Sequence, residues 1–230
     1  YPDTSPPQIV YQVIRNRIAV DDTVKTKLPK SFAGAELSTD ATSQPPLQYL
    51  LMVSTIEPRK NHQLLMQAWE MLRYSTHPHL KLVVVGNMGW DQGPVLQSFR
   101  PWAERGDLFW LNNVPAAELR ALYTHAAATV CPGLAEGFDY SGVEAMKCGC
   151  PVAASDIPVH REIYDQAAVY FNTYSAADAS QCIGQLLSPK AQAQREQLRA
   201  QGLQVGQRYT ENAILPQWAK LFARLTTPKH

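Results

Sequence analysis

From Leu47 onward, short apolar runs alternate along the chain with longer segments whose apolar residues recur at helical spacing. Apolar runs of about four to eight residues indicate buried strands, and apolar residues three and four positions apart indicate amphipathic helices. This alternation is typical of repeated strand–helix–strand units, which build a parallel sheet covered by helices on both faces. The pattern therefore predicts an α/β fold, a Rossmann-like doubly wound parallel sheet of about six strands.

The predicted elements follow one another in a regular order. Strands are expected at residues 47–53, 80–85, 108–111, 127–131, 152–154 and 168–171. Helices are expected between them at 62–73, 95–103, 115–125, 141–148 and 159–164, and after the last strand at 176–187, 190–209 and 214–225. We therefore expect a Rossmann-like domain over residues 47–187, with C-terminal helices over residues 188–230 packing on it.

Residues 1–46 have a different pattern, with six prolines and few clustered apolar residues apart from Ile9–Ile14. Proline donates no backbone hydrogen bond, so it is confined to edge strands, turns and linkers. We expect residues 1–46 to be a proline-rich linker or the remnant of a preceding domain, with one edge strand at Ile9–Ile14.

The composition is that of an ordinary globular protein, with 45% hydrophobic and 18% charged residues. Lys and Arg total 21 against 20 Asp and Glu, so no global field attracts nucleic acid, and any anion site is local. The four cysteines form no Cys-x-x-Cys pair, and no apolar run reaches the roughly 18 residues of a membrane span. We expect a cytoplasmic protein, with peripheral attachment to the inner face of the membrane left open for the full-length chain.

Ligands of doubly wound sheets bind beyond the carboxyl ends of the strands, so the loops after the predicted strands hold the candidate chemistry. The loop after the first strand, Ser54–Asn61, contains the adjacent cations Arg59 and Lys60. Such a pair beside a helix start suits a phosphate group. The alternative is a pair of solvated cations with no ligand.

The loop after the fourth strand contains glycines and leads into a helix near Ser141. Free backbone N–H groups and the positive end of the helix would form an anion cradle there. Two carboxylates flank the cradle, Glu136 in the loop and Glu144 about one turn into the helix. A carboxylate accepts hydrogen bonds from paired hydroxyls such as those of a ribose or hexose. Alternatively, Glu136 caps the loop and Glu144 faces solvent.

Two segments then identify a family resemblance. The stretch Glu136–Met146, followed by Cys148–Asp156, resembles the Glu-x7-Glu signature of family 4 glycosyltransferases, and so does Glu57–Asn61 after its strand. The resemblance runs in order from Tyr49 to about Leu187. It implies one half of the two-domain GT-B architecture: the half that binds the nucleotide-sugar, with the acceptor supplied by an N-terminal domain. The likeness is closest to bacterial mannosyltransferases of surface polysaccharide synthesis.

The resemblance also implies roles for individual residues. Glu144 would bind the ribose hydroxyls, Glu136 would approach the transferred sugar, and Arg59 with Lys60 would hold the diphosphate. The remaining donor-binding positions would be Gly137, Phe138, Asp139, Tyr140, Ser141, Gly142, Gly86 and Val114. Two departures from the family pattern stand out, because Asp139 replaces a usual glycine next to the sugar and Ser54 stands where many members have arginine.

The expected function, as the resemblance implies, is that of a retaining, metal-independent hexosyltransferase. Its expected donor is GDP-mannose, and its acceptor is a glycan or a lipid-linked molecule. No Asp-x-Asp and no His-x-x-x-His occurs, so neither a divalent ion nor another cofactor is expected. The isolated half is expected to fold and to be inactive in transfer. Two alternatives stay open, a non-catalytic nucleotide-sugar-binding module and a GT-B nucleotide-sugar epimerase.

Overall fold

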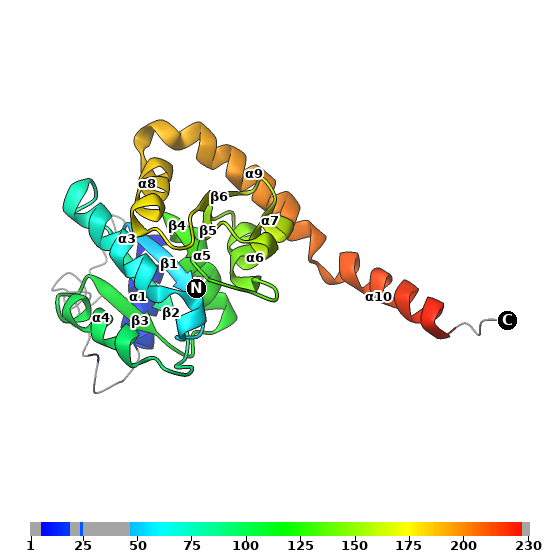
Figure 1. Cartoon of the computed structure of the whole chain (residues 1–230), viewed down its shortest axis with the longest axis horizontal. Coiled ribbons are helices and arrows are strands. Elements are labelled where there is room, and N and C mark those ends of the chain that lie inside the picture. The colour runs from blue at the N-terminus through cyan, green and yellow to red at the C-terminus, as the bar shows by residue number, and fades with distance from the viewer. Residues whose placement is uncertain (1–5, 19–23, 25–46, 227–230) are drawn as a thin grey trace.

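The computed structural model of the chain describes residues 6–18, residue 24 and residues 47–226, and its centre is a six-stranded sheet (Figure 1). The strands are β1 (Tyr49–Val53), β2 (Lys81–Val85), β3 (Leu108–Leu111), β4 (Ala128–Cys131), β5 (Val152–Ser155) and β6 (Ala168–Phe171). Every pair of neighbouring strands is parallel, and the order across the sheet is β3-β2-β1-β4-β5-β6. The predicted doubly wound parallel sheet is confirmed.

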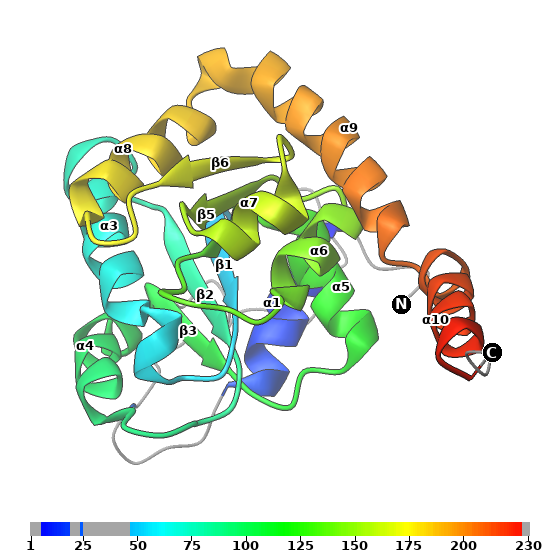
Figure 2. The ribbon, with the colours of Figure 1, turned by 45° about the vertical axis from the view of Figure 1, so that its right-hand side comes forward.

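Helices cover both faces of the sheet, as the turned view in Figure 2 shows. One face packs against α3 (His62–Ser75), α4 (Gly93–Glu104) and α8 (Ala176–Leu187). The other packs against α1 (Pro6–Arg17), α5 (Ala116–His125) and α6 (Tyr140–Lys147). Successive residues of a strand face opposite sides of the sheet. In β1, Leu50 and Met52 pack on the side of α3, whereas Tyr49 and Leu51 pack on the side of α1. The strands therefore read as continuous apolar runs, because both of their faces are buried.

The predicted edge strand at Ile9–Ile14 is wrong, because this segment lies within the helix α1. Val10, Val13 and Ile14 are buried against the sheet, and their spacing of three and four residues is that of a helix face. A short apolar run does not distinguish a helix from a strand, and prolines at a helix start cost little because the first N–H groups lack partners anyway. Residues 25–46 of the predicted linker lie outside the described part of the chain.

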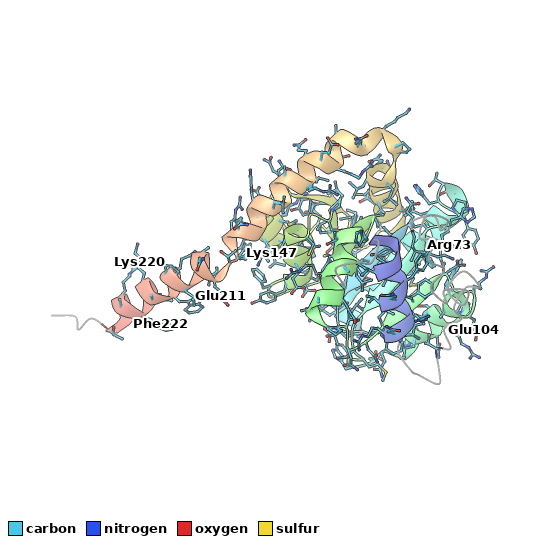
Figure 3. The ribbon with its side chains drawn as sticks, turned by 180° about the vertical axis from the view of Figure 1, so that it is seen from behind. Arg73, Glu104, Lys147, Glu211, Lys220 and Phe222 are labelled. Atoms are coloured by element: carbon cyan, nitrogen blue, oxygen red, sulfur yellow. The ribbon has the colours of Figure 1, made fainter. Side chains whose placement is uncertain are left out.

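The chain after β6 is helical and continues from α8 through the short turn η2 (Pro189–Ala191) to α9 (Gln192–Arg208) and α10 (Glu211–Thr226). Of the other short elements, η1 (Pro58–Lys60) follows β1, and α7 (Pro158–Tyr164) connects β5 to β6. The helix α9 packs across α6, and the Lys147 ammonium donates to the Tyr209 carbonyl oxygen at 3.0 Å. Beyond that point α10 projects away from the domain (Figure 3), and Trp218 and Phe222 are exposed on it. Within the described ranges, no helix is long and apolar enough to cross a membrane.

The strand order determines where a ligand can bind. β1 lies beside β4, although two strands separate them in the sequence, and the chain winds outward on either side of this pair. The loops after β1 and β4 therefore leave the sheet in divergent directions, and a crevice opens between them at the carboxyl edge. In open α/β sheets this switch point is where ligands bind.

Candidate functional site

Asn61 is one of the residues that hold the loop after β1 against the loop after β4. This residue ends η1 in the left-handed conformation (φ 58°, ψ 40°), which asparagine tolerates better than most residues. Its amide nitrogen donates to the carbonyl oxygens of Pro132 and Thr173, each at 3.1 Å. The backbone of Leu134 also donates to the Arg59 carbonyl oxygen at 2.9 Å. These bonds fix the cationic turn opposite the glycine-containing loop.

The structure brings three of the predicted residues into direct contact. Both oxygens of the Glu136 carboxylate are engaged, one by the Arg59 guanidinium and the other by the Lys60 ammonium, each at 2.7 Å. The Glu136 side chain is only 4% exposed. Arg59 donates in addition to the Ala135 carbonyl oxygen at 2.8 Å and to Glu57 at 2.7 Å. The hydrogen bond that Arg59 donates to Glu136 raises the pKa of Arg59, so this cation stays charged at any physiological pH.

Asp139 forms the start of α6 and lies beneath the same loop. Its Oδ1 atom accepts from the Ser141 backbone N–H at 3.1 Å, which is the contact of a helix N-cap. The Asp139 carboxylate is buried. The aspartate that stands here in place of the expected glycine therefore puts a charge inside the protein and not on its surface. The helix end that the sequence predicted as an anion cradle is therefore capped by a side chain of the protein itself.

His160 is the buried neighbour of Asp139, and sequence reasoning missed it. The ring is fully buried, with Nδ1 2.9 Å from the Ser155 carbonyl oxygen. Its Nε2 lies 3.2 Å from Asp139 Oδ2 without the alignment of a regular hydrogen bond. Burial would raise the pKa of Asp139, but His160, Ser141 and Tyr164 outweigh it and hold that pKa below its usual value.

Glu144 lies on the exposed side of α6, about one turn in from Asp139. The hydroxyl of Tyr123 donates to Glu144 Oε2 at 3.1 Å. Tyr123 is buried, and burial together with the Glu144 charge raises the pKa of its phenol, so it acts only as a neutral donor. Tyr123 thus orients a carboxylate on the exposed side of α6, and no sequence pattern indicated this pairing.

A narrow cleft between the β1 and β4 loops contains several of these groups. Its lining includes Ser54, Lys60, Gly133, Glu136, Asp139 and Ser141. His62 lies behind it, 3.2 Å from the Ser54 hydroxyl, and burial together with the Lys60 charge lowers the pKa of His62 to about 3. This ring is therefore neutral near pH 7. Among the residues that the structure describes, no group of three or more His, Cys, Asp and Glu side chains is placed to hold a metal ion.

The other predicted donor-binding residues lie around this cleft or beyond it. The rings of Phe138 and Tyr140 lie 4.6 Å apart, and Tyr140 is exposed. Gly86, after β2, approaches the backbone of Ser54 so closely that an added Cβ would lie 1.9 Å from the carbonyl oxygen. Val114, after β3, packs against the apolar layer under α1 and α5. Neither Gly86 nor Val114 lines the cleft, so their proposed donor contacts stay predictions.

Comparison with known proteins identifies related sequences. A family described as glycosyl transferases group 1 matches residues 38–205. O-antigen chain mannosyltransferase B of Escherichia coli is 34% identical over 121 residues, which are 53% of this chain and 32% of that protein. Serotype-specific mannosyltransferase WbdA of Escherichia coli is 33% identical over 134 residues, 58% of this chain and 16% of WbdA. The chain thus spans a third or less of the length of these relatives.

The fold has a clear counterpart among solved structures. Sucrose-phosphate synthase from Thermosynechococcus elongatus superposes with a TM-score of 0.68 at 21% identity, covering 79% of this chain and 46% of the other. At that identity the likeness concerns the fold alone. It agrees with the Rossmann-like half of a GT-B architecture that the sequence predicts.

Proposed function

The chain belongs to the group 1 glycosyl transferases, and from that premise we propose that it binds a nucleotide-sugar donor in the cleft between the β1 and β4 loops. It then serves the transfer of a hexose to a glycan or lipid-linked acceptor. The observation that carries this proposal is the convergence of Arg59, Lys60 and Glu136 at the start of α6, at the switch point of the sheet. Ligands of this fold class bind at that point.

The proposed chemistry follows from the charges that the reaction creates. Breaking the bond between the sugar carbon and the diphosphate oxygen leaves positive charge on the ring and negative charge on the departing diphosphate. Arg59 and Lys60 lie before the start of α6, where they would stabilise the second charge, and we propose that they do so without a divalent ion. The acceptor oxygen attacks on the same face, and its proton passes to the leaving diphosphate. This course retains the anomeric configuration, with Glu136 stabilising the ring and forming no covalent bond.

The donor and the acceptor are further parts of the proposal. GDP-mannose is favoured as donor, because the relatives at 33–34% identity are named as mannosyltransferases. A second domain outside these 230 residues would hold the acceptor hydroxyl, because loss of its positioning removes a contribution of about 7 to 11 kcal/mol to lowering the barrier. The isolated chain is then expected to bind donor and transfer nothing. The free thiols of all four cysteines suit the reducing cytoplasm, where the enzyme would work at the inner face of the membrane.

The proposed diphosphate contact is tested by removing the cations. Arg59→Ala and Lys60→Ala should each weaken binding of GDP about ten-fold or more, because each charge-assisted hydrogen bond contributes about 1.5 to 3 kcal/mol. Binding of guanosine, which lacks phosphate, should change less than about two-fold. The loss for GDP should also shrink as salt is added, since screening weakens exposed charge contacts. Calorimetry with both ligands at two salt concentrations measures these differences.

Arg100→Ala is the matched control, because Arg100 forms an exposed ion pair with Glu104 on α4, away from the cleft. It should leave both affinities unchanged. Equal losses for GDP and guanosine in the Arg59 and Lys60 variants would show that these residues support the fold and do not contact phosphate. UDP and ADP in the same titrations test the choice of base.

A separate prediction concerns Glu144 and the ribose. Glu144→Ala should weaken GDP binding by about 1.5 to 3 kcal/mol, because a charged acceptor of the ribose hydroxyls is lost. Unlike the cation variants, it should weaken guanosine binding equally. Affinity for 2′-deoxy-GDP should change little, since part of the contact is already missing. Calorimetry with the three ligands measures the pattern.

Tyr123→Phe is the companion variant, because it removes the bond that orients Glu144 and leaves the carboxylate in place. It should produce a smaller loss with the same preference for ribose over deoxyribose. If a folded Glu144→Ala protein binds GDP with unchanged affinity, Glu144 does not contact the ribose and is a solvent-facing helix residue.

A further inference from the structure

The cation pair of the cleft is occupied by a carboxylate of the protein itself. Both Glu136 oxygens lie at hydrogen-bond distance from Arg59 and Lys60, and Arg59 also pairs with Glu57. The two cations are thus matched by two carboxylates, and the four side chains together carry no net charge. A diphosphate approaching this cluster would meet cations whose charge is already compensated.

Resting on the proposed function, we propose that Glu136 is an internal competitor for the diphosphate, which displaces its carboxylate from Arg59 and Lys60 and frees it to reach the sugar. In the empty site the carboxylate holds the two cations in place. In the loaded site the diphosphate takes over both contacts. The same exchange moves Glu136 from the phosphate side of the cleft to the sugar side.

Displacement is expected because the anions cannot share the site at low cost. The Glu136 side chain is almost fully buried, so little water would screen it from an adjacent diphosphate. Like charges at close range in such surroundings repel, and one of them must move or bind a proton. Since the diphosphate is the more highly charged anion, it gains more from the two cations than a single carboxylate does.

The loop is built so that Glu136 can take the paired position and also leave it. An added Cβ at Gly133 would lie 2.7 Å from Glu136 Oε1, so a methyl group there would push the carboxylate from its paired position. The neighbours of Glu136 in the loop, Ala135 and Gly137, are exposed, and a Cβ at Gly137 would meet no atom within 4 Å. The carboxylate therefore fits closely beside Gly133, while the residues on either side of Glu136 are exposed.

This arrangement couples two events in the reaction. Glu136 reaches the sugar only when a diphosphate occupies the cations, whereas a nucleoside or a free sugar leaves it paired. Breaking the ion pairs of Glu136 with Arg59 and Lys60 costs free energy, so it lowers the apparent affinity for every diphosphate ligand. A protein that mostly occupies a state unable to bind shows the same reduction in affinity. Removing the competitor should therefore tighten binding of a diphosphate, although the residue is part of the binding site.

Inorganic pyrophosphate is the probe of choice, because its binding does not depend on the base or the sugar. In calorimetry on the 230-residue chain, Glu136→Gln should bind pyrophosphate about ten-fold more tightly than the parent, since the competing charge is gone. Gly133→Ala should bind it about three-fold more tightly, because the new methyl group disfavours the paired position and leaves the carboxylate in the protein. Gly93→Ala, at an open position at the start of α4, should change nothing.

The outcomes separate this inference from the function beneath it. In one outcome, Arg59→Ala and Lys60→Ala lose affinity for pyrophosphate, while the folded variants Glu136→Gln and Gly133→Ala bind it no more tightly than the parent. This outcome overturns the displacement of Glu136 and leaves the diphosphate site in place. Equal pyrophosphate binding by the parent and the two cation variants overturns the diphosphate site itself. Thermal unfolding of each variant shows whether it is folded. Tighter binding by Gly133→Ala distinguishes competition from mere loss of a negative charge, because that variant keeps Glu136.

Discussion

Replacing Asp139 with alanine is expected to destabilise the folded chain by about 1 to 3 kcal/mol for the buried polar neighbour that it leaves without a partner, and by about 1 kcal/mol more for the lost helix cap. The substitution leaves fully buried His160 without its neighbouring carboxylate at 3.2 Å. It also removes the cap that accepts from the Ser141 backbone at the start of α6. Urea unfolding at pH 7, followed by circular dichroism, measures the loss.

The same carboxylate predicts how this loss depends on pH. The folded state holds the pKa of Asp139 below the ordinary value of 3.8, so its contribution to the free energy of unfolding is fully present above that value. As the pH falls below 3.8 toward the folded-state pKa, the contribution disappears. The stability difference between the parent and Asp139→Ala should therefore narrow as the pH is lowered through this range.

Asp156→Ala is the matched control, because Asp156 pairs with Arg161 at the surface, where both side chains are about half exposed. An exposed pair of this kind contributes at most about 1 kcal/mol. If the two aspartate variants lose similar stability, or if the gap for Asp139 stays constant as the pH falls, Asp139 is not a buried charge that supports the site.

The second large effect is expected at Gly142, in the first turn of α6. An added Cβ would lie 2.1 Å from the Tyr164 hydroxyl oxygen and 2.3 Å from the ring carbon that bears it. Tyr164 is fully buried and stacks on His160, with ring centroids 5.2 Å apart, so it has little room to move. Gly142→Ala should therefore destabilise the chain by about 3 kcal/mol, at the upper end of the usual cost of overpacking.

For a domain of this size, 3 kcal/mol corresponds to a fall of roughly 6 to 12 °C in the melting temperature. Gly137→Ala is the matched comparison, because it makes the same change five residues earlier in a place where a Cβ meets nothing within 4 Å. That variant should melt within about 2 °C of the parent. Differential scanning calorimetry of the pair measures the effect. Similar melting temperatures for both variants would mean that Tyr164 adjusts without cost.

The sequence by itself determined the elements of this protein and the side of the sheet on which its chemistry lies. The six strands are buried on both faces, so each appears as an apolar run, and the helices between them keep their own spacing. Both signals are local, and they place the cationic loop and the Glu136 loop at the same edge. The one element misassigned, α1, is a segment whose short apolar run fits either structure, and only packing against β3 and α5 decides for the helix.

The tertiary structure alone decided which side chains meet at that edge. Lys60 and Glu136 are 76 residues apart in sequence, and they pair because β1 and β4 are neighbours in a strand order that no local pattern encodes. Asp139 and His160 come together in the same way, across the connection from β4 through β5 to α7. The type of a residue indicates which chemical groups its side chain can bind. Which residue becomes its partner depends on burial and on the distance between the two side chains in the folded chain. For that reason Lys60, Glu136, Asp139 and Ser141 of the cleft were among the predicted site residues, whereas the pairing of the cations with Glu136 and the burial of Asp139 were not predicted.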